Sequence, residues 1–361
     1  MDLFQQNDSF VSNCSLNQTS NMDNLRFGIN GVAGAVIAML SVANNSLLFY
    51  VFLQSQKLRR QNYANPMLLA LFDAIVSLCH IGTICISSFA YHYQSTGLVY
   101  AWIAYVRELY CFQHICITIC NFLLVVASLE RFCANALEGR QKSFLMVTVK
   151  NKGAVVALIV FLSTILKGTF YFETAIADFP GCGEINRYAP VVGQATQFST
   201  IRFITRKTLT VIIPFFIILY CNSQIVSAHR AKHRDAKKAS MRAASICEDN
   251  TTSSGCLRPN YTEKKGVRTA TRTLMLVMGC YLISNTTSTI VNFAEFFDPK
   301  WLEDNFYIYL LVQDASCLLT IVGCFCRLPI YCLSDRRIRK AVTRAVIRMT
   351  HNKKRALEMP P

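Results

Sequence analysis

The residues whose types are most suited to chemistry stand at the end of a long apolar run, 113–134, which reads QHICITICNFLLVVASLERFCA. About 20 helical residues cross the roughly 30 Å hydrocarbon layer of a bilayer, so this run is long enough to span one. Its last residues include an adjacent acid and base, Glu130 and Arg131. A charge at membrane depth is expensive unless it meets a partner or a water-filled cleft, so the pair predicts a functional ionic contact. The alternative is an arginine that extends to the membrane surface and keeps its charge in water.

Other chemistry is not indicated by the residue spacing. The chain contains no nucleophile elbow, phosphate-binding loop or HExxH sequence, so we do not expect an enzyme. Most of the 16 cysteines fall inside apolar runs, where a thiol behaves as a small hydrophobic group, and no spacing is typical of a zinc site. We therefore expect no metal and no cofactor.

The composition places the chain in a membrane. Of its 361 residues, 52% are hydrophobic and 16% are charged, which is typical of a helical membrane bundle. The net charge of +16 could indicate nucleic-acid binding. The basic residues, however, lie between the apolar runs and in the carboxyl-terminal tail, where orientation in the membrane explains them. We therefore expect a multi-pass membrane protein with lipid contacts and no nucleic-acid partner.

Seven apolar runs are long enough to cross a bilayer: 29–53, 65–89, 102–136, 153–172, 205–228, 269–293 and 305–331. Lys and Arg cluster after the first, third, fifth and seventh runs, so the positive-inside rule places the amino terminus outside and the carboxyl terminus inside. The prediction is an all-α membrane protein, a seven-transmembrane helix bundle at 29–331 with a cytoplasmic amphipathic eighth helix.

The segments outside the bundle differ in character. Segment 1–28 is polar and is expected to be an extracellular glycosylated tail. Its sequons begin at Asn7, Asn13 and Asn17. The connection 229–268 is long and basic, and we expect a third cytoplasmic loop in which both flanking helices continue beyond the membrane. Segment 332–361 has apolar residues at helical spacing opposite bases, which predicts a helix on an anionic lipid surface.

This organisation resembles the G-protein-coupled receptors over the whole transmembrane region. Four helices carry matching residues: Asn45, Asp73, the triplet Glu130-Arg131-Phe132, and Pro214. The chain departs from the common branches because the sixth run reads CYLI without the usual proline, the fourth run has no tryptophan, and the seventh ends RLPIY. The sequences ERFCA and LPIYCLSDRRIRK are similar to those of the nematode serpentine chemoreceptors, especially classes a and ab.

The resemblance implies a chemosensory receptor of the plasma membrane, with the sensory cilium as one location. It would bind a small extracellular ligand and activate a heterotrimeric G protein. The switch residues carried over are Glu130, Arg131, Tyr281 and Tyr331, with Glu130 paired to Arg131 at rest. One alternative is a neuropeptide receptor of the same architecture. A transporter or channel is a further alternative, against which the chain shows no inverted repeat.

The resemblance also gives a specific expectation for the polar core, which includes Asn45. Asp73 would normally share a sodium ion with polar groups of the third and seventh helices, but Arg327 stands at the matching seventh-helix position and Cys120 replaces a hydroxyl. We therefore expect an Asp73–Arg327 ion pair in place of sodium. The alternative is that Arg327 extends towards the membrane surface.

The ligand pocket implied by the resemblance includes polar residues on the outer halves of the helices: His80, Gln113, His114, Arg206, Lys207, Asn285 and Asp314. If both Arg206 and Lys207 face inward, they favour an acidic ligand. The family usually joins the third helix to the second outer loop by a disulfide, and we expect Cys111–Cys182. The alternatives are Cys14–Cys182 or no bridge, because sequence cannot establish connectivity.

Overall fold

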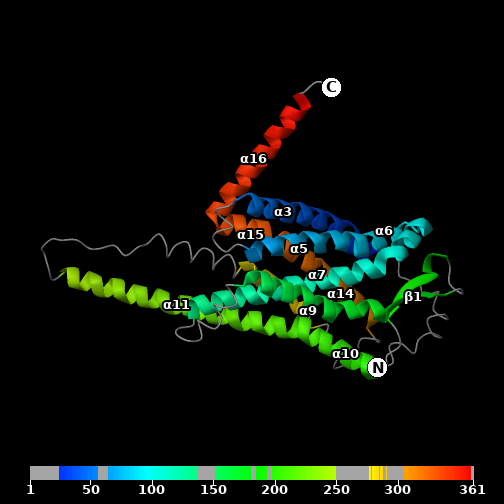
Figure 1. The fold of residues 1–361 in the computed structure, drawn as a ribbon, viewed down its shortest axis with the longest axis horizontal. Helices are drawn as coiled ribbons and strands as arrows, with labels where there is room; N and C mark the ends of the chain where they lie inside the picture. Colours follow the sequence, from blue (N-terminus) through cyan, green and yellow to red (C-terminus); the bar gives the residue numbers. More distant parts are fainter. Residues whose placement is uncertain are drawn as a thin grey trace.

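The structure is a computed structural model of the full chain and describes residues 24–55, 64–136, 151–179, 184–192, 197–248 and 305–358, with short pieces between 276 and 290. The predicted glycosylation sites Asn7, Asn13 and Asn17 lie outside these residues, as does Cys182. Figure 1 shows a bundle of long helices that run side by side; one of them continues beyond the bundle, and a further helix near the carboxyl terminus extends away from it.

The described part of the chain contains six helices that are long and apolar enough to cross a membrane. They span Asn24–Gln54, Ala64–His92, Thr96–Cys133, Lys152–Glu173, Ile204–Ala228 and Ile308–Ser334. They correspond to the first five predicted runs and the seventh, while most of the sixth predicted run, 269–293, lies outside the described residues. The chain is therefore a multi-pass helical membrane protein.

Several spans are built from consecutive helical pieces. The first joins η1 (Phe27–Ala33) to α3 (Gly34–Gln54), and the second joins α5 (Ala64–His80), η2 (Ile81–Cys85) and α6 (Ile86–His92). The third is one helix, α7 (Thr96–Ala136), and the fourth is α9 (Lys152–Glu173). The fifth joins α10 (Gln197–Lys207), η4 (Thr208–Ile212) and α11 (Ile213–Glu248), and the last joins α14 (Phe306–Phe325) to α15 (Arg327–Ser334).

The three short pieces η1, η2 and η4 are π-helical, with a wider turn than an α-helix. Such segments often occur near functional sites because they shift the register of the side chains that follow. The segment η4 ends at Ile212, two residues before Pro214. This proline has no backbone N–H to donate a helical hydrogen bond.

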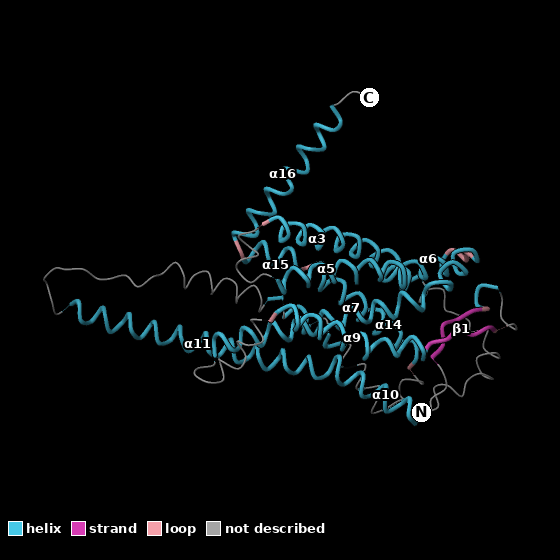
Figure 2. The backbone as a smooth tube through the Cα atoms, viewed as in Figure 1, coloured by secondary structure: helices cyan, strands magenta, loops and turns pink. Residues whose placement is uncertain are grey.

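An antiparallel hairpin lies at one end of the bundle, here called the hairpin end (Figure 2). Strand β1 (Thr174–Asp178) follows α9 directly and pairs with β2 (Tyr188–Val192), so that Thr174 faces Val192 and Asp178 faces Tyr188. The Asp178 carboxylate accepts a hydrogen bond from Arg187 at 3.0 Å, and this bond raises the pKa of the exposed guanidinium. The sequence did not predict the hairpin, because five residues are too few for a clear alternation.

Helix α7 occupies the centre of the bundle and contacts α5, α9 and α11, while α3 packs against α5 and α14. The core between them is apolar and closely packed, with Leu48, Leu123, Leu124 and Ile218 fully buried. By contrast, α9 exposes large apolar side chains such as Leu158 on its outer face. In a membrane protein that face meets lipid, so its exposure carries no penalty.

Two basic helices extend from the other end of the bundle, here called the α16 end (Figure 1). Helix α11 continues to Glu248, well past the predicted membrane boundary at 228, as expected for a helix that extends into the loop 229–268. Helix α16 (Arg336–Glu358) begins after Asp335, whose carboxylate accepts a hydrogen bond from the backbone N–H of Arg337. This bond satisfies a free donor at the helix start.

The buried leucines of α7 should contribute more to stability than the outer leucines of α9. We expect Leu124→Ala to destabilise the purified protein by roughly 2–5 kcal/mol, because the side chain leaves a cavity in a close-packed core. Leu158→Ala is the matched control, since the same atoms are removed from a side chain that is 55% exposed. Thermal unfolding in detergent measures both, and equal melting temperatures would contradict the assigned core.

Candidate functional site

A charge pair lies in the middle of the bundle. The Asp73 carboxylate on α5 forms an ion pair with the Arg327 guanidinium at the first residue of α15, and the two side chains are 1% and 7% exposed. The predicted Asp73–Arg327 pair is thus confirmed, and the alternative of an arginine that extends to the membrane surface is excluded. Because buried charges are strongly desolvated, each side chain keeps the other in place.

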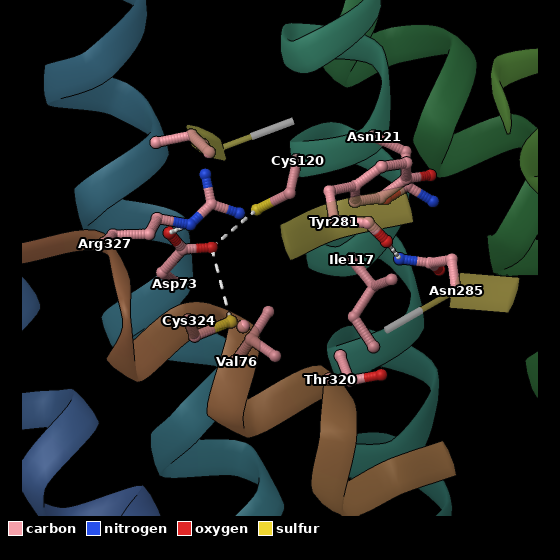
Figure 3. Close-up of a pocket in the computed structure, with 12 residues that line it drawn as sticks. Asp73, Val76, Ile117, Cys120, Asn121, Tyr281, Asn285, Thr320, Cys324 and Arg327 are labelled. Carbon is pink, nitrogen blue, oxygen red and sulfur yellow. Dashed lines mark hydrogen bonds and ion pairs between the residues drawn. The ribbon is translucent and has the colours of Figure 1, made fainter. Parts of the chain in front are cut away.

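Two thiols complete the surroundings of the aspartate. Cys120 of α7 and Cys324 of α14 each place Sγ 3.5 Å from Asp73 Oδ1, while Arg327 takes Oδ2 (Figure 3). Both carboxylate oxygens therefore have partners from the chain itself. The expected replacement of sodium by the arginine stays a prediction.

The charge pair borders a small cavity of about 30 Å³, which is room for one or two water molecules. Polar groups of Asn121, Asn285 and Thr320 also line it, together with the Tyr281 ring (Figure 3). Among the residues that the structure describes, Arg327 Nη1 is a buried donor with no hydrogen-bond partner. A water molecule in the cavity would satisfy that donor.

A second set of hydrogen bonds joins the charge pair to the first helix. Asn45 Nδ2 lies 3.0 Å from both the Ser41 and the Cys324 carbonyl oxygens. The Ser41 and Ser77 hydroxyls are 2.7 Å apart, and Ser77 donates to the Asp73 carbonyl oxygen at 2.8 Å. Cys324 therefore accepts a hydrogen bond from Asn45 of α3 through its carbonyl oxygen and donates one to Asp73 of α5 through its thiol.

The acid and base at the end of α7 lie at the α16 end. Glu130 accepts a hydrogen bond from Asn65 Nδ2 of α5 at 3.3 Å. The charge of Arg131 acts on the buried Tyr331, whose ring packs edge-on against Phe52 of α3. These residues bring α3, α5, α7 and α15 together at one level. The predicted pairing of Glu130 with Arg131 stays a prediction.

The residues assigned to a ligand pocket do not form one cluster. Gln113 is buried and accepts a hydrogen bond from Thr83 at 2.8 Å, while His80 is buried in α5. Asp314 forms an ion pair with Arg26 at 2.7 Å, which joins α14 to the start of the first span. Asn285 lines the central cavity instead. These contacts are those of residues that hold helices together.

Arg206, Lys207 and His114 do lie near one another, towards the hairpin end. Arg206 Nη1 is 2.8 Å from Glu173 Oε2, and its guanidinium lies 5.2 Å from the centre of the Phe170 ring. The sequence reading missed Lys167, a buried lysine of α9 whose charge interacts with Arg206 and Lys207. A single lysine inside the fourth apolar run was the available signal.

The predicted Cys111–Cys182 disulfide is wrong in this structure. Cys111 is a free, buried thiol with Sγ 3.6 Å from the Lys167 carbonyl oxygen. The reason is depth, because Cys111 faces α9 within the bundle and not the hairpin above it. The described residues also contain no group of three or more His, Cys, Asp or Glu side chains that could hold a metal.

No protein-family model matches the chain, and no curated protein matches its sequence. The assignment of a function therefore depends on the geometry described above.

We expect that breaking the central charge pair destabilises the protein strongly. Asp73→Asn or Arg327→Gln leaves an uncompensated buried group, and each should cost about 3–5 kcal/mol of stability. The double variant Asp73→Arg/Arg327→Asp should recover part of the loss, because the attraction is restored with reversed sign. Thermal unfolding in detergent measures all three.

The exposed pair Asp178–Arg187 of the hairpin provides the control for this series. Asp178→Asn should leave the melting temperature unchanged, since both side chains are about half exposed and surface pairs contribute little. For the central pair, the assigned pairing would be contradicted if the double variant Asp73→Arg/Arg327→Asp lost more stability than the two single variants together.

Proposed function

We propose that this protein is a G-protein-coupled receptor that crosses the plasma membrane seven times. Segment 269–293 supplies the sixth crossing, in addition to the six helices of the described residues. The receptor binds a small molecule from the environment at the hairpin end and activates a heterotrimeric G protein at the α16 end. Its ancestry is that of the nematode serpentine chemoreceptors, which its ERFCA and LPIYCLSDRRIRK sequences resemble.

The position of Arg131 is the observation that supports this proposal most directly. It stands near the end of the central helix α7, next to a carboxylate held by Asn65 and near Tyr331. The ends of α5, α7 and α15 meet at the same end as the extended helix α11 (Figure 1). A cation kept there at considerable cost fits a contact that forms when the helices separate.

The charge distribution supports the proposed orientation. The extension of α11 beyond residue 228 carries Arg230, Lys232, Arg234, Lys237, Lys238 and Arg242. Helix α16 has a similar excess of bases, with Ile338 and Ala345 buried on its inner side. By the positive-inside rule the α16 end faces the cytoplasm, where α16 lies on anionic lipids. The hairpin end then faces the outside.

The central charge pair gives the proposed receptor a way to couple its two ends. Arg327 follows α14 after a single residue, Cys326, so a ligand that displaces α14 also displaces the guanidinium. Asp73 is fixed to α5 and, through Cys120, contacts α7. A ligand that binds one arrangement of α14 more tightly than another therefore shifts the population of both ends.

Arg131→Ala should abolish signalling without preventing insertion. In cells that express the full chain, we expect a second-messenger response to members of a library of volatile and water-soluble compounds. The response should fall to background in Arg131→Ala at equal surface expression. Arg187→Ala is the matched control, because it removes an exposed arginine at the opposite end.

Two outcomes would contradict this proposal. An unchanged response in Arg131→Ala would remove the assigned role of that cation. Responses confined to a synthetic peptide panel would favour a neuropeptide receptor of the same architecture.

A further inference from the structure

Lys167 of α9 is a buried lysine, and Glu173 is the acid whose charge attracts its ammonium group. It is 8% exposed and shares the inner face of α9 with Ile159 and Ser163, four residues apart in each step. Helix α9 packs against α7, so this face is turned into the protein and away from lipid. A lysine in such a place requires an anion or must lose its proton.

The nearby acid cannot supply that anion. Glu173 Oε1 pairs with Arg202 and Oε2 pairs with Arg206, both at 2.8 Å. Lys167, Arg202 and Arg206 therefore share one carboxylate, and both of its oxygens already have arginine partners. Arg206 and Lys207 add repulsion to the Lys167 ammonium. This region of the bundle therefore has an excess of positive charge around the buried Lys167 side chain.

The surroundings of the cations are aromatic. The His114 ring lies 4.4 Å from that of Tyr110 and 6.0 Å from that of Phe170, measured between centroids. The Arg206 guanidinium lies over the Phe170 ring, with its central carbon 5.2 Å from the ring centroid. His114, Tyr110 and Phe170 are each partly exposed.

We propose that Lys167, with Arg206 and the rings of His114 and Phe170, binds a small organic carboxylate that has an apolar body. The carboxylate pairs with Lys167 and Arg206, and the apolar part packs on the aromatic rings. Binding replaces the missing acid, so the affinity depends on the negative charge. The identification of this carboxylate with the signalling ligand rests on the proposed receptor function, whereas the binding site itself does not.

The direct test uses the purified full chain in a neutral detergent that contains no phosphate. The probes are acetate, hexanoate, octanoate, benzoate and phenylacetate, each compared with its primary amide, and binding is followed by calorimetry and by thermal shift. At least one carboxylate should bind and raise the melting temperature, while its amide should not. Absence of binding by every carboxylate would overturn the proposal, and this comparison requires no variant.

Lys167→Met tests the assigned residue. It should weaken carboxylate binding about 10- to 100-fold, the equivalent of one lost charge-assisted hydrogen bond. Lys167→Arg should retain part of the affinity because the charge is kept. Lys152→Met is the matched control, since it removes a lysine from the opposite end of the same helix. Equal losses in Lys167→Met and Lys152→Met would overturn the assignment.

Two further arms separate the sources of failure. In the first arm, anionic phospholipid is added to the protein. If the phospholipid binds, Lys167→Met weakens that binding, and no soluble carboxylate binds, the site is a lipid site and the proposal is overturned. A carboxylate that binds but gives no second messenger in cells would contradict the receptor function and leave the site intact. Messenger responses that do not change in Lys167→Met would contradict the carboxylate as signalling ligand.

Discussion

A charge inside a membrane protein must find its partner within the bundle, and the Asp73–Arg327 ion pair is the central case. The two side chains come from α5 and from α15, and neither is more than 7% exposed. Lipid offers no hydrogen bonds, so separation of these helices would leave two unpaired charges in an apolar medium. The pair therefore restricts how far the last span can move relative to the second.

The hydrogen bonds around the pair extend this restriction to the other helices. Cys324 is bonded both to Asn45 of α3 and to Asp73 of α5, and Cys120 adds α7. Four spans are thus joined through one aspartate and its neighbours. Towards the hairpin end, ion pairs of the same kind join Arg26 to Asp314 and Arg206 to Glu173. The polar groups hold specific helix pairs together, while the apolar core fills the space between them.

Much of this organisation could be predicted from sequence because the bilayer imposes a simple length rule on apolar runs. The Asp73–Arg327 pair was predictable through the resemblance, which places Arg327 at the seventh-helix position that would normally share a sodium ion with the aspartate. Contacts that depend on how each helix is rotated about its own axis could not be predicted from the sequence. Gln113 and Asp314 were assigned to one pocket but have separate partners, and Cys111 faces Lys167 instead of the outer loop. The pairing of the five-residue strands and the burial of Lys167 also arise only from the tertiary arrangement.

The proposed receptor requires an odd number of crossings, with the basic α16 end inside the cell. The most direct measurement labels epitopes at the two termini of the full chain in intact and in permeabilised cells. The account predicts that the amino-terminal epitope is labelled in intact cells and that the carboxyl-terminal epitope is labelled only after permeabilisation. Both termini on the same face of the membrane would contradict it.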